Sequence, residues 1–280
     1  RLQDYPRHRG TRRAEGERAV FVTIDRARAA ADAWSMITPS DQQWVCQLWP
    51  DRGDDRHTVV TAGVDLDYYT MSPDRREEGL IVHVGTLLPD TNYPGMVWYC
   101  RQVMPRVLEA VPEAQLRLVG RVGGEELSEQ RFGFLDLAGV VPDVRPHLHA
   151  GTVFVAPIFV GSGIKLKVLQ AMATGNAVVT TTVGAEGIGA TSGEHLIVAD
   201  DVEAFAEAVT RCLRDTETRH RLGAAARRFI EKNYSLQAVG GKLSGCLEEI
   251  RSVTPVPPVA LPRWLERRCG EEEPARPEKA

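Results

Sequence analysis

Two lysines follow two glycines in the segment Gly161–Ile188, which reads GSGIKLKVLQAMATGNAVVTTTVGAEGI. Gly161 and Gly163 lack side chains, so the backbone N–H groups of a turn can approach a ligand closely there. The residues that follow have the composition of a helix, whose positive N-terminal end favours an anion such as phosphate. Lys165 and Lys167 oppose that helix dipole unless an anion compensates them. We call residues 161–167 the glycine–lysine turn and predict that it binds a phosphate group.

Ligands of open α/β sheets bind where strands end and helices begin. Two other segments of the sequence combine a strand end with a turn. Gly85 and Thr86 follow the apolar run LIVHV, and Val141 lies in the segment VVPDV after the run FLDLAG. These two turns and the glycine–lysine turn are the candidate binding segments.

Strands and helices alternate regularly from Leu80 onward. Buried strands are predicted at LIVHVG, AQLRLVG, FLDLAGVV, TVFVAPI, NAVVTTT and HLIVAD. Apolar residues at helical spacing lie between and after them, as in MVWYCRQVMPRVLEAV and DVEAFAEAVTRCLRD. Such alternation is typical of a parallel sheet with helices on both faces. We therefore predict an α/β fold with a doubly wound, Rossmann-like parallel sheet.

The boundaries of some elements carry local signals. Ser40 is placed to cap a helix that follows Pro39, and Asp143 to cap the helix in VRPHLHA. Gly175 stands where a glycine would close the helix predicted over about 164–174. A further, largely exposed helix is predicted before Trp34.

The composition is that of an ordinary globular protein of 280 residues, with 43% hydrophobic and 26% charged residues. The formal net charge of −4 gives no support for a nucleic-acid partner. The five cysteines lack CxxC spacing, which argues against a disulfide framework and a zinc site. His147 and His149 are poorly spaced to share a metal on one helical face, so we expect no metal ion.

Several separated blocks of the sequence resemble, in the correct order, the GT-B fold glycosyltransferases of the family 4 type (glycosyl transferases group 1). The blocks are VGT, WYCRQVMPRVLEAVPEAQLRLVGR and LAGVVPDVRPHLHAGTVFVAPIFVGSGIKLKVLQAMATGNAVVTTTVGAEGI. The resemblance runs from about Val59 to Ile250 and concerns mainly the C-terminal, donor-binding half of such enzymes. The earlier block AADAWSMITPSDQQWV resembles the last strand and helix of their N-terminal domain.

This resemblance implies a division of the chain into four parts. Residues 1–76 would be a remnant of the N-terminal acceptor domain plus the interdomain linker. Residues 77–235 would form the Rossmann-like domain that binds a nucleotide-sugar donor, and 236–252 a C-terminal helix. We expect the tail, 253–280, which is rich in Pro and Glu, to be disordered.

The implied activity is transfer of a sugar from a nucleotide-diphosphate sugar to an acceptor, with no other cofactor. The diphosphate would lie on the glycine–lysine turn near Lys165 or Lys167, the nucleobase near Val141, and the ribose near position 170. The resemblance assigns no catalytic residue. It implies these donor-binding residues: Gly85, Thr86, Val141, Gly161, Ser162, Gly163, Ile164, Lys165, Lys167 and Gln170.

Two features depart from the family pattern. The motif normally has two glutamates eight positions apart, and here Ser162 and Gln170 occupy those positions. The neutral amide of Gln170 binds a ribose hydroxyl more weakly than a carboxylate does, so we expect weaker donor binding. Only about 76 residues precede the donor domain and the first is Arg, which predicts a truncated chain or a second polypeptide that supplies the acceptor domain.

Two other functions remain open on the sequence alone: a non-catalytic nucleotide-sugar-binding or scaffold subunit, and a GT-B epimerase. The acceptor would be a carbohydrate, a lipid-linked molecule or a small molecule. The scattered cysteines and the lack of a membrane-spanning apolar run predict a cytoplasmic protein. The basic N-terminal residues allow peripheral contact with the inner membrane surface.

Overall fold

A computed structural model describes residues 34–48, 57–72, 75–88, 92–127, 131–161 and 163–252. By its internal contacts the chain divides into two compact units, of which the larger comprises Met36–Arg52 and Val59–Gly245. The described residues of the other unit are 34–35, 57–58 and 246–252. The helix predicted before Trp34 and the tail 253–280 lie outside the described residues, and the division into four parts stays a prediction.

Six parallel strands form the central sheet of the larger unit, in the order β5-β4-β3-β6-β7-β8. The chain thus starts in the middle, winds to one edge, returns to the middle and winds to the other edge, which confirms the predicted doubly wound fold. The strands are β3 Leu80–Val84, β4 Gln115–Val119, β5 Leu135–Gly139, β6 Val153–Ala156, β7 Ala177–Thr180 and β8 Ile197–Val198.

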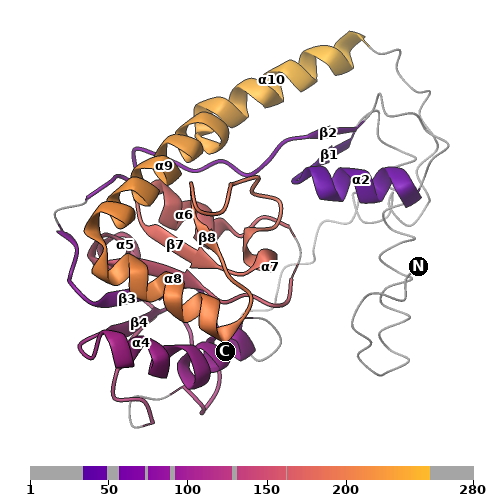
Figure 1. Cartoon of the computed structure of the whole chain (residues 1–280). Helices are drawn as coiled ribbons and strands as arrows, with labels where there is room; N and C mark the ends of the chain where they lie inside the picture. The colour runs from indigo at the N-terminus through magenta and orange to yellow at the C-terminus, as the bar shows by residue number, and fades with distance from the viewer. Residues whose placement is uncertain are drawn as a thin grey trace, which may run out of the picture. The chain divides into compact units, whose positions relative to one another are not determined.

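Helices cover both faces of this sheet (Figure 1). Consecutive residues of a strand point to opposite faces, so Ile81 joins one apolar cluster and Val82 the other. The first cluster includes Phe205 of α8, and the second includes Leu169 of α6 and Ile230 of α9. The helices described wholly within this unit are α2 Pro39–Leu48, α3 Tyr93–Trp98, η4 Tyr99–Val103 (a π-helix), α4 Met104–Ala110, α5 Arg145–Ala150, α6 Leu166–Ala173, α7 Thr182–Ala185, α8 Val202–Arg214 and α9 Thr216–Tyr234.

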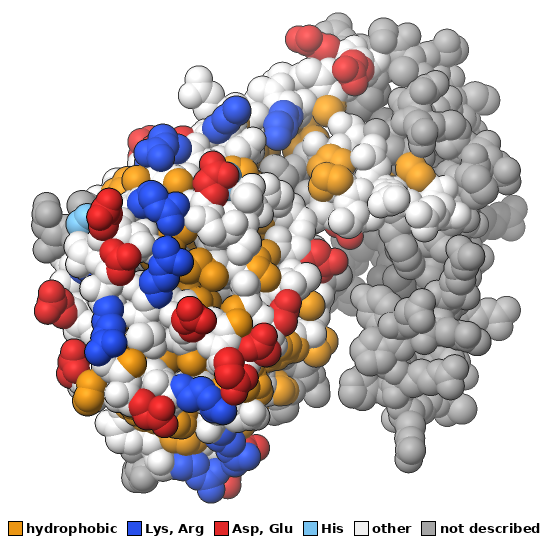
Figure 2. Space-filling view, in the orientation of Figure 1, with side chains coloured by type: hydrophobic (Ala, Val, Ile, Leu, Met, Phe, Trp, Pro, Cys, Tyr) orange, Lys and Arg blue, Asp and Glu red, His pale blue; other side chains and the backbone are white. Residues whose placement is uncertain are grey.

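Three elements include residues of both units. The strands β1 Trp34–Met36 and β2 His57–Val59 pair as a separate two-stranded sheet, and α10 spans Leu236–Ser252. No helix in the described part of the chain has both the length and the apolar composition needed to cross a membrane. Figure 2 shows basic and acidic side chains interspersed over the visible face, so neither sign of charge dominates it.

The local signals for helix ends give mixed results. Helix α2 spans Pro39–Leu48, so Ser40 lies inside it, and the prediction that Ser40 caps it is wrong. The cap is Thr38, whose Oγ1 accepts a hydrogen bond from Asp41 N at 3.0 Å. Pro39 takes the first helical position, which proline favours, so the N-cap position falls one residue earlier, at Thr38. The carboxylate of Asp143 accepts a hydrogen bond from Arg145 N at the start of α5, although the N-cap position of α5 is Val144 and not Asp143. Gly175 closes α6 with φ +71°, as predicted.

Candidate functional site

Two of the three predicted binding segments, those after β3 and β6, lie at the topological switch point of the sheet. Strands β3 and β6 are hydrogen-bonded neighbours, with Ile81 paired to Val153. From β3 the chain crosses to β4 on one side, whereas from β6 it crosses to β7 on the other side. The turns after β3 and β6 therefore diverge at the carboxyl edge, which is where open α/β sheets leave a crevice for ligands.

Lys167 of α6 lies directly over Gly85 at the end of β3. A Cβ built on Gly85 would stand 2.7 Å from Lys167 Nζ and 3.1 Å from its Cε, so a side chain at residue 85 would displace the end of the lysine. Within the described residues, the half-buried ammonium of Lys167 has no hydrogen bond and no ion pair. Burial, followed by the nearby charge of Lys165, lowers the pKa of Lys167 to about 8. At pH 7 it is thus a cation without a counter-ion, aimed at the turn that follows β3.

Lys165 has a different role in the same turn. Its ammonium donates a hydrogen bond to the carbonyl oxygen of Gly163 at 2.6 Å and lies 3.9 Å from Glu186 Oε2. Its side chain is only 11% exposed. Gly161 and Gly163 have φ +125° and +71°, conformations that favour glycine. Lys165 therefore holds the shape of the turn, and Lys167 is the cation beside it that has no partner among the described residues.

The N-terminus of α6 has no side-chain cap in the part of the chain that the structure describes. Its N-cap residue is Lys165, whose side chain forms no capping hydrogen bond. Other helices of the same unit have a side-chain cap, among them α7 with Thr181, α8 with Asp201 and α9 with Asp215. The first amide groups of an uncapped helix carry partial positive charge. At α6 this charge adds to that of Lys167, so the edge of the sheet between β3 and β6 is suited to an anion.

Gln170 lies three positions after Lys167 on α6, a spacing that makes the two residues neighbours on the helix surface. It is half-buried, and its side chain has no hydrogen bond within the described part of the molecule. Its amide can therefore still accept or donate a hydrogen bond to a ligand.

The remaining predicted residues have more varied surroundings. Thr86 is exposed after β3, and Val141 is partly buried against the core cluster that contains α6. Ile164 lies beside Gly187: its Cγ1 is 3.4 Å from the position that a Cβ on Gly187 would occupy. Ser162 lies outside the described residues. Val141 follows the edge strand β5, which is two strands away from β3, and the predicted nucleobase position stays a prediction.

Two residues of this region are absent from the sequence prediction. Glu186 approaches Lys165 from beyond β7, and no local pattern links residues so far apart. His83 is buried in β3, with its Nδ1 2.8 Å from the carbonyl oxygen of Val155 on β6. The sequence does contain a signal for His83. Residues two apart in an extended strand point to the same face, and His83 precedes Gly85 by two.

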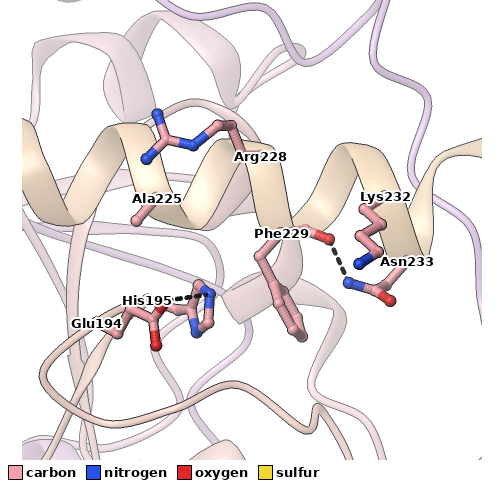
Figure 3. A pocket seen from close by; sticks show the side chains of 7 residues that line it. All are labelled: Glu194, His195, Ala225, Arg228, Phe229, Lys232 and Asn233. Atoms are coloured by element: carbon pink, nitrogen blue, oxygen red, sulfur yellow. Dashed lines mark hydrogen bonds and ion pairs between the residues drawn. The ribbon is translucent and has the colours of Figure 1, made fainter.

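A hollow of about 410 Å³ lies on α9 and is separate from this site (Figure 3). His195 packs against Phe229 there, with ring centroids 4.7 Å apart, and its Nδ1 accepts from Thr191 N. His195 precedes β8, so it lies at the amino edge of the parallel sheet, opposite the edge that carries Gly85 and Lys167. The hollow is lined by Glu194, His195, Ala225, Arg228, Phe229, Lys232 and Asn233.

Comparison with known proteins places this architecture in a family. The sequence model of the family described as Glycosyl transferases group 1 matches residues 78–215, which hold most of the sheet and its helices. An uncharacterized 44.6 kDa protein of the cps region of Klebsiella pneumoniae is 29% identical over 168 residues, 57% of this chain and 43% of its own length. The phosphatidyl-myo-inositol mannosyltransferase of Mycobacterium leprae is 29% identical over 154 residues, 52% of this chain and 41% of its own length. The chain thus spans less than half of these relatives.

Solved structures share the fold at lower identity. The Anabaena protein HepE in complex with UDP and glucose has a TM-score of 0.61 and 15% identity, over 78% of this chain and 63% of its own. Sucrose-phosphate synthase of Thermosynechococcus elongatus has a TM-score of 0.65 and 17% identity, over 83% of this chain and 62% of its own. The six-stranded sheet is thus the Rossmann-like half of a GT-B fold. Residues 78–215 thus match the group 1 glycosyltransferases, and the fold of this part of the chain is that of the donor-binding half of the family 4 type with the GT-B fold.

Proposed function

We propose that the larger unit binds a nucleoside-diphosphate sugar and serves a glycosyltransferase as its donor domain. The observation that carries this proposal is Lys167, a half-buried cation with no counter-ion among the described residues, over Gly85 at the switch point of the sheet. A diphosphate at this edge would supply the missing anion. The HepE structure, solved with UDP and glucose, supports a nucleotide sugar as the ligand class.

The same groups would assist the chemistry. Transfer breaks the bond between the anomeric carbon of the sugar and the diphosphate oxygen, and negative charge develops on that oxygen. Lys167 and the uncapped N-terminus of α6 would stabilise this charge, which is a major source of rate enhancement when the donors are held in place beforehand. Lys165 would contribute indirectly, because it fixes Gly163 and with it the shape of the turn.

The other parts of the donor would follow from the position of the diphosphate. The ribose would lie near Gln170, whose amide oxygen can accept from a hydroxyl, and the nucleobase near Val141. The backbone of Thr86 and of Gly161 to Ile164 would line the phosphates. The nucleobase and the sugar define the specificity of the enzyme, which calorimetry with different nucleotides and nucleotide sugars would measure.

The acceptor would bind outside the larger unit. GT-B transfer requires an acceptor held against the donor, and we propose that a further domain, in the same polypeptide or in a second chain, provides that contact. The acceptor would be a carbohydrate, a lipid-linked molecule or a small molecule. The mannosyltransferase relative is named for phosphatidyl-myo-inositol, which supports a lipid-linked acceptor as the first to be tried.

Calorimetry with UDP, GDP and ADP, each with and without an attached sugar, tests the proposal. We expect one nucleotide to bind, and Lys167→Met to weaken its binding by tenfold or more, since a hydrogen bond to a charged group contributes about 1.5–3 kcal/mol. Lys242→Met, which removes an exposed lysine from α10, is the matched control and should bind as the wild type does. If none of the three nucleotides binds at millimolar concentration, the proposed donor site is wrong.

A further inference from the structure

His83 is a buried, neutral imidazole next to the proposed diphosphate site. Its side chain is 1% exposed, and burial, followed by the charge of Lys167, lowers its pKa to about 3. A neutral imidazole has one N–H group and one lone pair. Because Nδ1 lies 2.8 Å from the carbonyl oxygen of Val155, which can only accept, Nδ1 carries the proton. The lone pair of His83 is therefore on Nε2.

This lone pair faces the space that Lys167 enters. Nε2 is buried and has no hydrogen-bond partner in the described structure. It lies 3.6 Å from the position of a Cβ on Gly85, and Lys167 Nζ lies 2.7 Å from that same position. The acceptor and the ammonium therefore both lie beside the position that a Cβ on Gly85 would occupy. A buried acceptor without a donor is costly, and an ammonium has three donors to offer.

We propose that His83 is a positioning residue for Lys167: its Nε2 would accept a hydrogen bond from the ammonium and hold it over Gly85, where the ammonium would meet the diphosphate. The inference rests on the proposed function, since it assigns Lys167 to that anion. His83 would not touch the ligand. Its contribution would be to fix one N–H of the lysine inward, which leaves the other two directed to the carboxyl edge of the sheet.

The charged groups around the two residues make this acceptor significant. Lys165, at the start of α6, is a second cation near Lys167 and lowers its pKa. The carboxylates at this edge act on Lys165 instead, namely Glu186 and Asp41 of α2. Within the described part of the chain, His83 is thus the acceptor placed to favour the protonated form of Lys167. Without it, the lysine would lose its proton at lower pH.

A matched pair of substitutions separates the two nitrogens of His83. The amide of Asn reaches the place of Nδ1 and can keep the hydrogen bond to Val155, whereas the amide of Gln reaches the place of Nε2 and can keep the acceptor for Lys167. The measurement is the affinity, at pH 6.5 and pH 8.5, for whichever of UDP, GDP and ADP the wild type binds most tightly. Thermal unfolding of each variant establishes that it is folded.

We expect His83→Asn to weaken binding about fivefold at pH 8.5, the effect of one lost hydrogen bond, and less at pH 6.5, where the lysine is charged in any case. His83→Gln should stay within about twofold of the wild type. If His83→Asn binds like the wild type at both pH values, or if the two variants lose affinity equally, the inference is wrong. Should Lys167→Met still abolish binding in that case, the proposed function stands without it.

The wild-type chain provides a measurement that does not depend on how a variant folds. Long-range ¹H–¹⁵N spectra report the protonation and tautomer of each of the seven histidines. One imidazole should remain neutral from pH 5 to pH 8 with its proton on Nδ1, and its Nε2 resonance should shift when nucleotide is added. A proton on Nε2 would leave no acceptor for Lys167 and would overturn the inference.

Discussion

The ammonium of Lys167 occupies the place that a side chain on Gly85 would need. The two residues follow neighbouring strands of the sheet, since Gly85 comes directly after β3 and α6, which carries Lys167, follows β6. A Cβ on Gly85 would stand 2.7 Å from Nζ, nearer than real Cβ contacts allow. The position of the Lys167 charge therefore depends on the absence of a side chain at residue 85.

Gly85→Ala should weaken nucleotide binding about tenfold, because the new methyl group displaces the ammonium that contacts the diphosphate. It should also cost about 1 kcal/mol of folding free energy, since φ is +147° at this residue. Calorimetry and urea unfolding measure the two effects. Gly193→Ala is the control: its φ is +83° and its Cβ would meet open space, so it should lose stability and keep its affinity. Equal affinity losses in both variants would contradict this explanation.

Nucleotide affinity should fall as the pH rises through about 8. The pKa of Lys167 is lowered from 10.5 to about 8, so its charge is present below that pH and disappears above it. Titrations between pH 7 and pH 9 test this, since the net loss of one cation should reduce affinity about tenfold. Lys167→Arg keeps its charge throughout and should give a flat profile. A decline that persists in Lys167→Arg would assign the effect to Lys165, whose pKa burial also lowers.

Gln170→Glu should strengthen nucleotide binding about threefold to tenfold, because a carboxylate forms stronger hydrogen bonds to ribose hydroxyls than an amide does. The comparison is with a nucleotide that lacks both ribose hydroxyls, for which the substitution should give no gain. An equal gain with both ligands, or no gain with either, would show that residue 170 does not contact the ribose.

Arg76→Met should destabilise the larger unit by about 3 kcal/mol, since it leaves buried carbonyl groups without a donor. Arg76 donates to the carbonyl oxygens of Leu148, Gly151 and Thr174 and to Asn176 Oδ1 at 2.6 Å, which ties the segment before β3 to the ends of α5 and α6. Urea unfolding measures the loss. Arg75→Met removes an exposed neighbour and should change stability by less than about 0.5 kcal/mol. A similar loss in both variants would mean that Arg76 stabilises the unit through its charge alone.

Much of the fold follows from the sequence because of how parallel strands are buried. Residues 80–84, 153–156 and 177–180 are buried throughout, so each strand appears as a continuous apolar run. Helix α7 is not predictable in this way. It has four residues after a run of threonines, and it depends on Asp200, whose carboxylate accepts from Thr182 N at 2.8 Å. Such a contact exists only after the sheet has formed.

The candidate site likewise has a part that the sequence predicts and a part that depends on the folded structure. The glycines and lysines are identifiable because their types are unusual at the start of an apolar helix. The sequence does not show which of the two lysines lacks a partner. Lys165 is bound by Gly163 and Glu186, and Glu186 is distant in sequence. The placement of His83 beneath Lys167 also requires the pairing of β3 with β6.

The most direct test of the donor site is to map nucleotide binding on backbone amides. We predict that the nucleoside diphosphate that binds in calorimetry shifts the ¹H–¹⁵N resonances of Gly85, Gly163, Ile164 and Lys167 together, and that Lys167→Met abolishes these shifts. Resonances that lie instead around the α9 hollow, at Glu194 and Asn233, would contradict a site at the switch point of the sheet. So would a nucleotide that binds and leaves the amides of Gly85 and Lys167 unchanged.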